Sequence, residues 1–338
     1  MSLPLRWLAD TGVQVSSLAL GTMGFGSDPE ADAAMYAAAR DAGINFFDCA
    51  DVYDGGASER SLGELVRDDR DQIVLCTKAY FPTGPGPNDR GSSRYHLVRA
   101  VEASLQRLQT DRIDLFFLHR FDDHASLERT LRAVDHLVAQ GKILYVGLSN
   151  VAAWQAQAAL GTAALHGLEG IVALQPMYNL AKRQAESEIL PMAQANGLAV
   201  FPYGPLGGGL LSGRYGRTER PDDGRLVANP MYATRYGDEA NYDLAERWRA
   251  KAQQLGVHPV SLAVAWVASH PAVTAPLLGA RTVEQLRPAL AAADIDMTPA
   301  LRAELSAMSP APAPATDRNE EGSAASYSAV LTEKPGSR

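Results

Sequence analysis

Cysteine is scarce in this chain, with two residues, Cys49 and Cys76, among 338. Two thiols cannot form a disulfide framework, and their spacing is not that of a metal site. We therefore expect both to be structural residues of the core.

The chain also lacks an excess of positive charge, since 31 Lys and Arg face 39 Asp and Glu, for a formal net charge of −8. Without a basic field there is nothing to attract a nucleic acid. The densest charged runs, RDDRD at 67–71 and RTERPDD at 217–223, mix both signs and are typical of solvated loops. We expect no nucleic-acid partner.

Long hydrophobic runs are absent as well. No window reaches the roughly 18 apolar residues that span a bilayer, and the start, MSLPLRWLADTGVQVSSLALG, lacks the segments of a secretory signal. These absences predict a cytoplasmic protein with no membrane partner.

What the chain does contain is a repeated alternation of short apolar runs with segments of helical spacing. Strands separated by helices pair in parallel, and eight such units match a closed (β/α)8 TIM barrel. An open dinucleotide-binding sheet would need G-x-G-x-x-G after its first strand, whereas this chain has GTMGFGS there. The eight runs are residues 16–23, 44–50, 72–80, 113–120, 143–150, 170–178, 198–206 and 274–280.

Three stretches lie outside the repeat. LRWLADTGVQVSS resembles an N-terminal hairpin that plugs one end of a barrel, and residues 207–239 are long enough to be a lid or binding loop. From Ser309 the chain is rich in Pro, Ala and Ser. We expect one barrel domain over residues 1–308 and a mobile C-terminal extension over 309–338.

Polar residues gather where the strands end, which is where barrel enzymes place their active sites. The second strand ends in Asp48 with Tyr53 just beyond, the third in Lys78 and the fourth in His119. Neighbouring strands are roughly 4.8 Å apart, so these side chains can meet. Each alone has a plainer interpretation, as an ion pair or a structural histidine, but together they supply a proton donor and groups that tune it.

The roles follow from ordinary pKa values. A free tyrosine titrates near about pH 10, and a nearby ammonium favours the phenolate. We therefore expect Tyr53 to be the acid, Lys78 to lower its pKa, Asp48 to hold Lys78, and His119 to donate a hydrogen bond to a substrate oxygen. One His and one Asp make too few ligands for a metal. Asp51 and Asp54 are interpreted as loop solvation or turn formation.

Taken with these residues, the sequence resembles the aldo-keto reductase family, and the resemblance extends to about residue 308. It implies a (β/α)8 barrel, NADP(H)-dependent carbonyl reduction and a catalytic tetrad of Asp48, Tyr53, Lys78 and His119. The motifs that carry it are FFDCADVYDGGASERSLGELV, CTKAY, SLQRLQTDRIDLFFLH, VGLSN, LQPMYNL, YGPLGGGLLSG and GARTVEQL.

The resemblance also implies contacts with the dinucleotide. Ser149, Asn150 and Gln175 match residues that hold the nicotinamide carboxamide, and Tyr203 matches the aromatic residue that stacks on the ring, with core packing as the alternative. Leu206, Gly208 and Arg214 match the pyrophosphate loop, and Arg281 and Gln285 the adenosine end. The full cofactor set is Gly21, Thr22, Met23, Asp48, Ser149, Asn150, Gln175, Tyr203, Pro205, Leu206, Gly208, Arg214, Gly279, Arg281 and Gln285.

This chain departs from the family pattern at the cofactor. Gly204 stands where relatives carry Ser, and Pro288 and Ala289 where many carry Glu-Asn. Fewer polar contacts to adenine are expected, so the preference for NADP(H) rests mainly on Arg281, and NAD(H) remains possible.

For the substrate, apolar and aromatic residues near the strand ends favour a small carbonyl compound with a hydrophobic body, although the same residues suit packing equally well. Two other interpretations stay open: a nucleotide-sensing regulatory subunit with little turnover, which barrels similar to this one serve as, and a metal-dependent hydrolase. No oligomeric state follows from the sequence. The proposed pocket residues are Phe25, Tyr80, Phe81, Phe121 and Tyr178, together with Met23.

Overall fold

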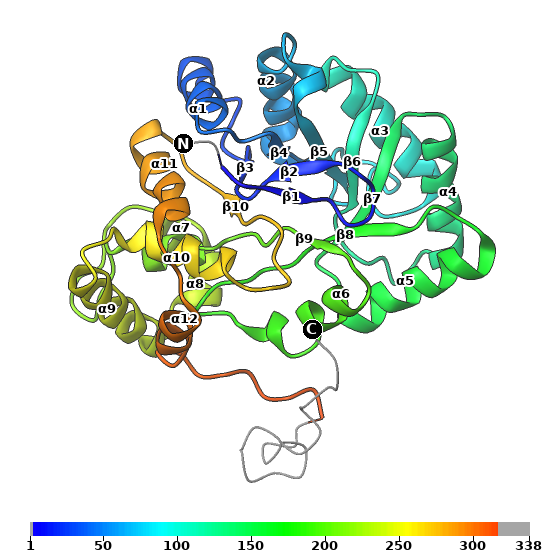
Figure 1. Cartoon of the computed structure of the whole chain (residues 1–338). Coiled ribbons are helices and arrows are strands. Elements are labelled where there is room, and N and C mark those ends of the chain that lie inside the picture. Colours follow the sequence, from blue (N-terminus) through cyan, green and yellow to red (C-terminus); the bar gives the residue numbers. More distant parts are fainter. Residues whose placement is uncertain (1–2, 317–338) are drawn as a thin grey trace.

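Eight parallel strands form the centre of the protein, as the computed structural model of residues 3–316 shows (Figure 1). Their order is β10-β3-β4-β5-β6-β7-β8-β9. The two outermost strands are joined by backbone hydrogen bonds from Thr274 to Val200 (2.8 Å) and from Leu277 to Pro202 (2.9 Å), so the sheet closes on itself. The predicted (β/α)8 barrel is confirmed. The strands are β3 (Ala19–Gly21), β4 (Phe46–Asp48), β5 (Val74–Ala79), β6 (Ile113–Leu118), β7 (Ile143–Ser149), β8 (Ile171–Gln175), β9 (Ala199–Val200) and β10 (Leu277–Leu278).

Helices surround the strands, and several begin at residues whose side chains cap the helix. Asp28, Ser93 and Thr282 each accept a backbone N–H of the helix that follows, which satisfies a donor that the helix itself cannot pair. The helices are α1 (Pro29–Asp41), α2 (Ala57–Leu65), α3 (Arg94–Leu108), α4 (Leu127–Ala139), α5 (Ala153–His166), α6 (Ile189–Ala195), α7 (Arg225–Ala228), α8 (Pro230–Tyr236), α9 (Glu239–Gln254), α10 (Pro259–Ala268), α11 (Val283–Leu290) and α12 (Pro299–Ser306), with short turns η1 (Tyr53–Gly56), η2 (Arg70–Gln72), η3 (Gln184–Glu186), η4 (Gly207–Ser212) and η5 (Ala291–Asp294).

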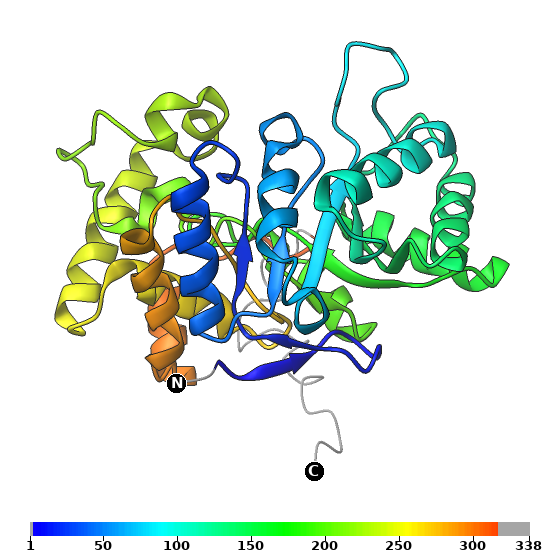
Figure 2. The same ribbon diagram turned by 90° about the horizontal axis from the view of Figure 1, so that it is seen from above.

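The predicted N-terminal hairpin is present as the antiparallel pair β1 (Leu5–Trp7) and β2 (Gln14–Ser16). It crosses the end of the barrel where the strands begin (Figure 2). Leu8 and Val15 of this hairpin are fully buried and belong to the same apolar cluster as the barrel interior, in which Phe46 and Phe201 stack at 4.3 Å. The hairpin therefore closes the barrel floor, which leaves the opposite end for a site.

The barrel interior is closely packed where Gly147 meets Phe117. A Cβ on Gly147 of β7 would lie 2.3 Å from the Phe117 ring, so only glycine fits beside this aromatic residue. The two predicted core thiols, Cys49 and Cys76, are both fully buried.

The excursion at residues 207–239 contains η4, α7 and α8. Its apolar residues form a small cluster of their own with α9, centred on Leu210, Tyr215, Leu226, Tyr236 and Tyr242. The segment thus packs against α9, and its yellow-green helices lie toward the end of the barrel opposite the hairpin in Figure 2.

Of the predicted C-terminal extension, residues 309–316 are described and 317–338 lie outside the described residues. Ser187 donates a hydrogen bond to the carbonyl of Ala313 at 2.8 Å, so the start of the segment contacts the barrel. The division at residue 308 stays a prediction.

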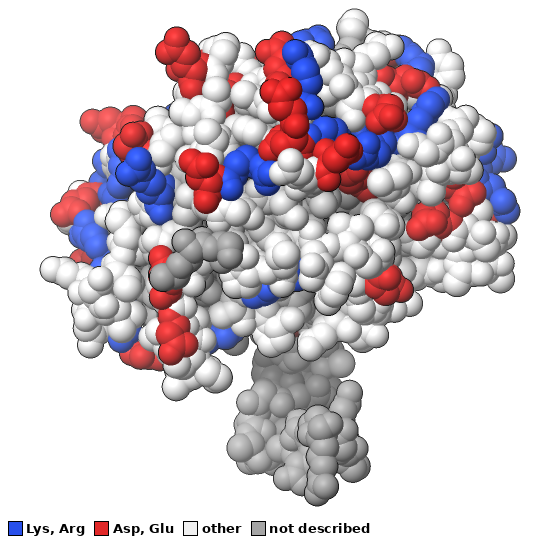
Figure 3. All heavy atoms as spheres, turned by 45° about the horizontal axis from the view of Figure 1, so that its top comes forward, with Lys and Arg blue, Asp and Glu red and all other residues white. Residues whose placement is uncertain are grey.

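Surface charge is mixed in sign. Figure 3 shows basic and acidic side chains side by side on one face. Within residues 3–316, no helix is both long and apolar enough to cross a membrane.

The hairpin offers a matched test of the barrel floor. Leu8→Ala is expected to lower the free energy of unfolding by about 2–5 kcal/mol, because it opens a cavity in a packed interior. Leu5→Ala, at a side chain that is 53% exposed on the same hairpin, is expected to change it by less than about 0.5 kcal/mol. Urea unfolding of both variants measures the difference; equal effects would contradict the plug.

Candidate active site

A buried ion pair lies at the end of the barrel opposite the hairpin. Nζ of Lys78, in β5, is 2.6 Å from Oδ2 of Asp48 at the end of β4, and it donates a second hydrogen bond to the carbonyl of Cys49, also at 2.6 Å. Lys78 is fully buried. Burial lowers the pKa of a lysine, but the charge of Asp48 outweighs it here, so the pKa of Lys78 is raised and the ammonium is retained.

The second oxygen of Asp48 is also occupied. Oδ1 accepts hydrogen bonds from Nε2 of Gln175 at 2.9 Å and from Sγ of Cys76 at 3.2 Å. Cys76 is thus more than a core thiol, a role that sequence reasoning missed. The signal was its position, because Cys76 is paired in register with Asp48 on the adjacent strand. The family resemblance matched Gln175 to a residue that holds the nicotinamide carboxamide. In this structure its side-chain N–H group donates a hydrogen bond to Asp48.

Tyr53 lies next to this pair. Its ring centroid is 5.2 Å from Nζ of Lys78, and its ring meets that of His119 edge-on at 6.1 Å. Burial raises the pKa of Tyr53, Lys78 opposes the rise, and the net pKa is above its ordinary value. Lys78 thus acts on this pKa in the expected direction, but desolvation of the phenolate outweighs the attraction of the ammonium.

His119 completes the group of four. It is buried, and Nδ1 has no hydrogen-bond partner among the described residues. Burial, and secondarily the charge of Lys78, lower the pKa of His119 well below its ordinary value. The imidazole is therefore neutral at pH 7 and holds one N–H to donate.

The two other acids of the opening loop differ from each other. Asp54 is exposed and takes a left-handed conformation with φ of 46°, as expected of a turn residue. Asp51 is only 2% exposed, and neither carboxyl oxygen has a partner in the part of the chain that the structure describes. Loop solvation is therefore wrong for Asp51, because its side chain is buried, whereas the residue does lie in a turn, the other interpretation offered by the sequence.

Further predicted residues border the tetrad. Oγ of Ser149 donates to the carbonyl of Gln175 at 3.0 Å, and Nδ2 of Asn150 donates to the carbonyl of His119 at 3.0 Å. The phenol of Tyr203 donates to Oδ1 of Asn150 at 2.7 Å. These contacts hold the ends of β6, β7 and β8 and the segment after β9 around one opening.

The end of β3 approaches from the other side. Gly21 is in register with Asp48, and Thr22 donates to the carbonyl of Asp48 through both its N–H (2.8 Å) and its hydroxyl (3.0 Å). Met23 is 41% exposed. The predicted Gly21, Thr22 and Met23 are therefore beside the ion pair.

The glycine-rich loop after Tyr203 has free backbone donors. Gly204 has φ of 67° with open space at its Cβ position, a backbone conformation that favours glycine over other residues. Pro205 is buried. None of the hydrogen bonds among the described residues is donated by the backbone N–H of Leu206 or Gly208. These two amides are available to an anion.

Arg214, predicted beside the pyrophosphate, forms an exposed ion pair with Asp223. At the adenosine end, the side chain of Arg281 is exposed and makes no ion pair within residues 3–316. The backbone N–H of Arg281 donates to Oε1 of Gln285 at 3.1 Å, and Gly279 is exposed nearby.

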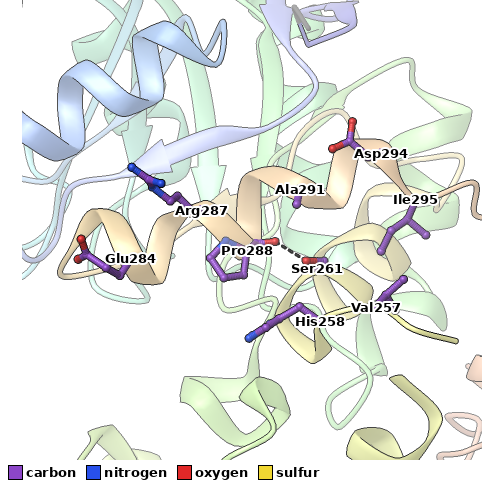
Figure 4. A pocket seen from close by; sticks show the side chains of 9 residues that line it. All are labelled: Val257, His258, Ser261, Glu284, Arg287, Pro288, Ala291, Asp294 and Ile295. Atoms are coloured by element: carbon purple, nitrogen blue, oxygen red, sulfur yellow. Dashed lines mark hydrogen bonds between the residues drawn. The ribbon is translucent and has the colours of Figure 1, made fainter. Parts of the chain in front are cut away.

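A surface pocket of about 660 Å³ lies between α10 and α11 (Figure 4). Pro288 lines it, with its carbonyl accepting from Ser261 Oγ at 2.6 Å, while Ala289 is buried in the core. Neither position offers a polar side chain, as expected from the sequence. His258, Glu284 and Arg287 add polar groups to the pocket wall.

The predicted substrate residues divide into two groups. Phe81 contacts the His119 ring at 4.8 Å and Tyr80 at 5.4 Å, and Phe121 contacts Trp154 at 5.7 Å. Trp154, which is 65% exposed, was missed, because the helical pattern of its segment only predicted a covering helix.

The other two predicted wall residues are in the core. Tyr178 is fully buried, its ring 5.1 Å from that of Trp266 and its hydroxyl donating to Glu186 at 2.6 Å. Phe25 is 3% exposed within the main apolar cluster. Placing them in a pocket wall is corrected, because both follow a strand end but turn toward the helix layer.

Metal chemistry has no evident centre. Over residues 3–316, no group of three or more His, Cys, Asp and Glu side chains is arranged to hold a metal ion.

The geometry defines a class: a (β/α)8 barrel whose open end carries a buried carboxylate–ammonium pair, a phenol and a neutral imidazole. The model of the aldo/keto reductase family matches residues 17–308, so the chain belongs to the aldo/keto reductase family, as its motifs indicated.

Proteins similar in sequence to this chain include some named as oxidoreductases or reductases and some named as potassium channel subunits. It is 37% identical to "Uncharacterized oxidoreductase YrpG" of Bacillus subtilis over 90% of this chain and 96% of the relative. It is 35% identical to a "Probable voltage-gated potassium channel subunit beta" of Arabidopsis thaliana over 85% and 90%. "Norsolorinic acid reductase" of Aspergillus flavus is 36% identical over 82% and 74%.

The ion pair predicts a large loss of stability when it is broken. Asp48→Asn is expected to cost about 3–5 kcal/mol, because it leaves the buried ammonium of Lys78 without its counter-charge. Asp71→Asn, which breaks the exposed pair with Arg112, is the control and is expected to cost no more than about 1 kcal/mol. Thermal unfolding of both proteins compares them, and similar losses would show that Lys78 is not buried as described.

Proposed function

We propose that this protein is an NADP(H)-dependent oxidoreductase that reduces the carbonyl of aldehydes or ketones to the alcohol, with Tyr53 as the general acid. The observation that carries the proposal is the position of Tyr53 between a buried ammonium and a neutral imidazole. Membership of the aldo/keto reductase family supports the class of reaction.

The residues present fit a nicotinamide dinucleotide. The free amides of Leu206 and Gly208 suit the pyrophosphate, and the unpaired guanidinium of Arg281 suits a ribose 2′-phosphate. Ser149, Asn150 and Gln175 would hold the carboxamide, and Tyr203 would lie against the ring. The bound dinucleotide supplies the hydride that reduces the carbonyl carbon.

Tyr53 supplies the proton. As the carbonyl oxygen gains negative charge, the O–H bond of Tyr53 breaks and a new O–H bond forms on the substrate oxygen, leaving a phenolate. Lys78 uses two of its three N–H groups to donate hydrogen bonds to the carboxylate of Asp48 and the carbonyl of Cys49. Its charge lies 5.2 Å from the Tyr53 ring centroid and stabilises that phenolate.

His119 orients the substrate. Because its pKa is lowered well below the ordinary value, it stays neutral and can hydrogen-bond the carbonyl oxygen without competing for the proton of Tyr53. Phe81 packs on its ring, and Phe121 packs on Trp154. These residues favour carbonyl compounds with a hydrophobic or aromatic body.

A second candidate function is a nucleotide-binding sensor subunit with little turnover. The similarity to proteins named as potassium channel β subunits favours it. The two functions differ in turnover. Tight binding of NADPH, measured by fluorescence quenching, together with steady oxidation of NADPH, measured at 340 nm with an aromatic aldehyde as the substrate, supports the reductase. Tight binding without turnover over a panel of carbonyl compounds supports the sensor.

The acid role of Tyr53 predicts a specific loss. Tyr53→Phe is expected to bind NADPH normally but to lower kcat for reduction by about 10²–10⁴-fold, because the proton donor is removed. Tyr95→Phe, at a tyrosine that is 63% exposed, serves as control and is expected to be unchanged. Near-normal turnover of Tyr53→Phe would refute the assignment.

The cofactor preference predicts a difference between two dinucleotides. Arg281→Ala is expected to weaken NADPH binding by about 10–100-fold, in line with the loss of a hydrogen bond to a charged group, and to leave NADH binding unchanged. Arg287→Ala, at an exposed arginine of α11 six residues further along the chain, is the control. Equal losses for NADPH and NADH would show that Arg281 does not read the 2′-phosphate.

A further inference from the structure

Asp51 is a buried acid that the proposed mechanism does not use. It lies two residues before Tyr53, and its backbone N–H donates to the carbonyl of Lys78 at 3.0 Å. The side chain is 2% exposed, yet neither oxygen has a hydrogen-bond partner among the described residues. An ionised carboxylate without partners is costly in such a place.

A second buried acid beside it is fully satisfied. Glu59, in α2, accepts a hydrogen bond from Nε of Arg107 on one oxygen and from Oγ1 of Thr77 on the other, both at 2.6 Å. The side chain of Arg107 lies against Gly56, where a Cβ would come within 2.8 Å of it. Among the described residues, Arg107 donates hydrogen bonds to Glu59 and to Ser104, and none to Asp51.

The charges that act on Asp51 come from three elements. Burial has the largest effect on its pKa, and the negative charge of Glu59 (α2) adds to it; Arg107 (α3), the nearby backbone N–H of Val52 and Lys78 (β5) act in the opposite direction. The balance raises the pKa of Asp51 to about 8. Two other groups on its own segment, Tyr53 and Cys49, stay protonated at this pH, because burial raises the pKa of both.

We propose that Asp51 is a positioning residue that is held as a neutral carboxylic acid, so that the charge of Lys78 serves only Asp48 and Tyr53, and that ionisation of Asp51 suppresses proton donation by Tyr53. The inference rests on the proposed reduction. It assigns a role to an acid that was expected to be loop solvation.

The effect of Asp51 on the reaction follows from the sign of its charge when it is ionised. When Asp51 loses its proton to solvent, a negative charge appears beside Lys78 and offsets part of the ammonium's field. The phenolate that Tyr53 becomes on giving up its proton is then less stable, so the reduction slows. Tyr53 itself cannot produce this alkaline loss, because its own pKa is raised above its ordinary value.

The pH–rate profile tests the proposal. For the full-length protein saturated with NADPH, kcat for reduction is expected to fall from about pH 8 upward and to level off at a lower value once Asp51 is ionised. Asp51→Asn, a neutral amide of the same shape, is expected to keep most of the rate at pH 7 and to lose the alkaline decline. An unchanged decline in Asp51→Asn, or a rate lost equally at every pH, would overturn the proposal.

Two further variants isolate the cause. Glu59→Gln removes the negative charge that disfavours ionisation of Asp51, so the decline is expected to move to lower pH; a decline that stays in place contradicts the linkage. Asp54→Asn changes the exposed acid of the same turn and is expected to leave the profile as it is. This second variant controls for a general effect of charge in the loop.

A readout without turnover separates this inference from the proposed function. At neutral pH the infrared spectrum is expected to contain the C=O stretch of a protonated carboxylic acid that Asp51→Asn lacks. If no carbonyl compound is reduced, the proposed function fails while the band still reports Asp51. Absence of the band at neutral pH would show that Asp51 is ionised and would overturn the inference.

Stability gives the same information with a defined sign. A folded-state pKa raised to about 8 means that the native state holds a proton that the unfolded state releases from about pH 4. Wild-type stability should therefore fall between these two pH values relative to Asp51→Asn. Thermal unfolding across this range measures it, and parallel curves for the two proteins would contradict a neutral Asp51.

Discussion

The pairing of Lys78 with Asp48 is the interaction on which the rest of the site depends. An ammonium taken out of water is tolerated only where its charge and its N–H donors are met. The carboxylate of Asp48 and the carbonyl of Cys49 meet them here, and Gln175 and Cys76 in turn satisfy Asp48. The network joins β4, β5 and β8, and it exists because a closed parallel barrel brings these three strand ends to one opening.

One buried charge then sets the protonation of its neighbours. Together with burial it keeps His119 neutral, and it partly offsets the effect of burial on Tyr53. For Asp51, the charges of Lys78 and Arg107 do not outweigh the effect of burial on its pKa, and the ion pair of Arg107 is with Glu59. The site can thus hold a proton donor, a neutral hydrogen-bond donor and a single cation within a few ångströms, without a metal ligand set among residues 3–316.

The corrections share a physical cause. Tyr178, Phe25 and Asp51 all follow strand ends, and the sequence shows that they are near the opening without showing which way their side chains turn. Along a strand, successive side chains point to opposite faces of the sheet, but beyond the last residue of the strand this alternation no longer applies. The net pKa of Tyr53 has a related explanation: the charge of a nearby lysine is visible in a motif, whereas the extent of desolvation, which outweighs it, is a property of the packed structure.

By itself the sequence determined the class of fold, the order of strands and helices, the hairpin, the buried cysteines and the family, since these depend on local periodicity, capping and short motifs. It also named the four residues that meet at the opening. Only the tertiary structure decided what each of them experiences: the closure between β9 and β10, the thiol of Cys76 on Asp48, the contact of Phe121 with Trp154 and the unpartnered carboxyl of Asp51. Each of these depends on distance and exclusion of water between segments far apart in the chain, which no local pattern encodes.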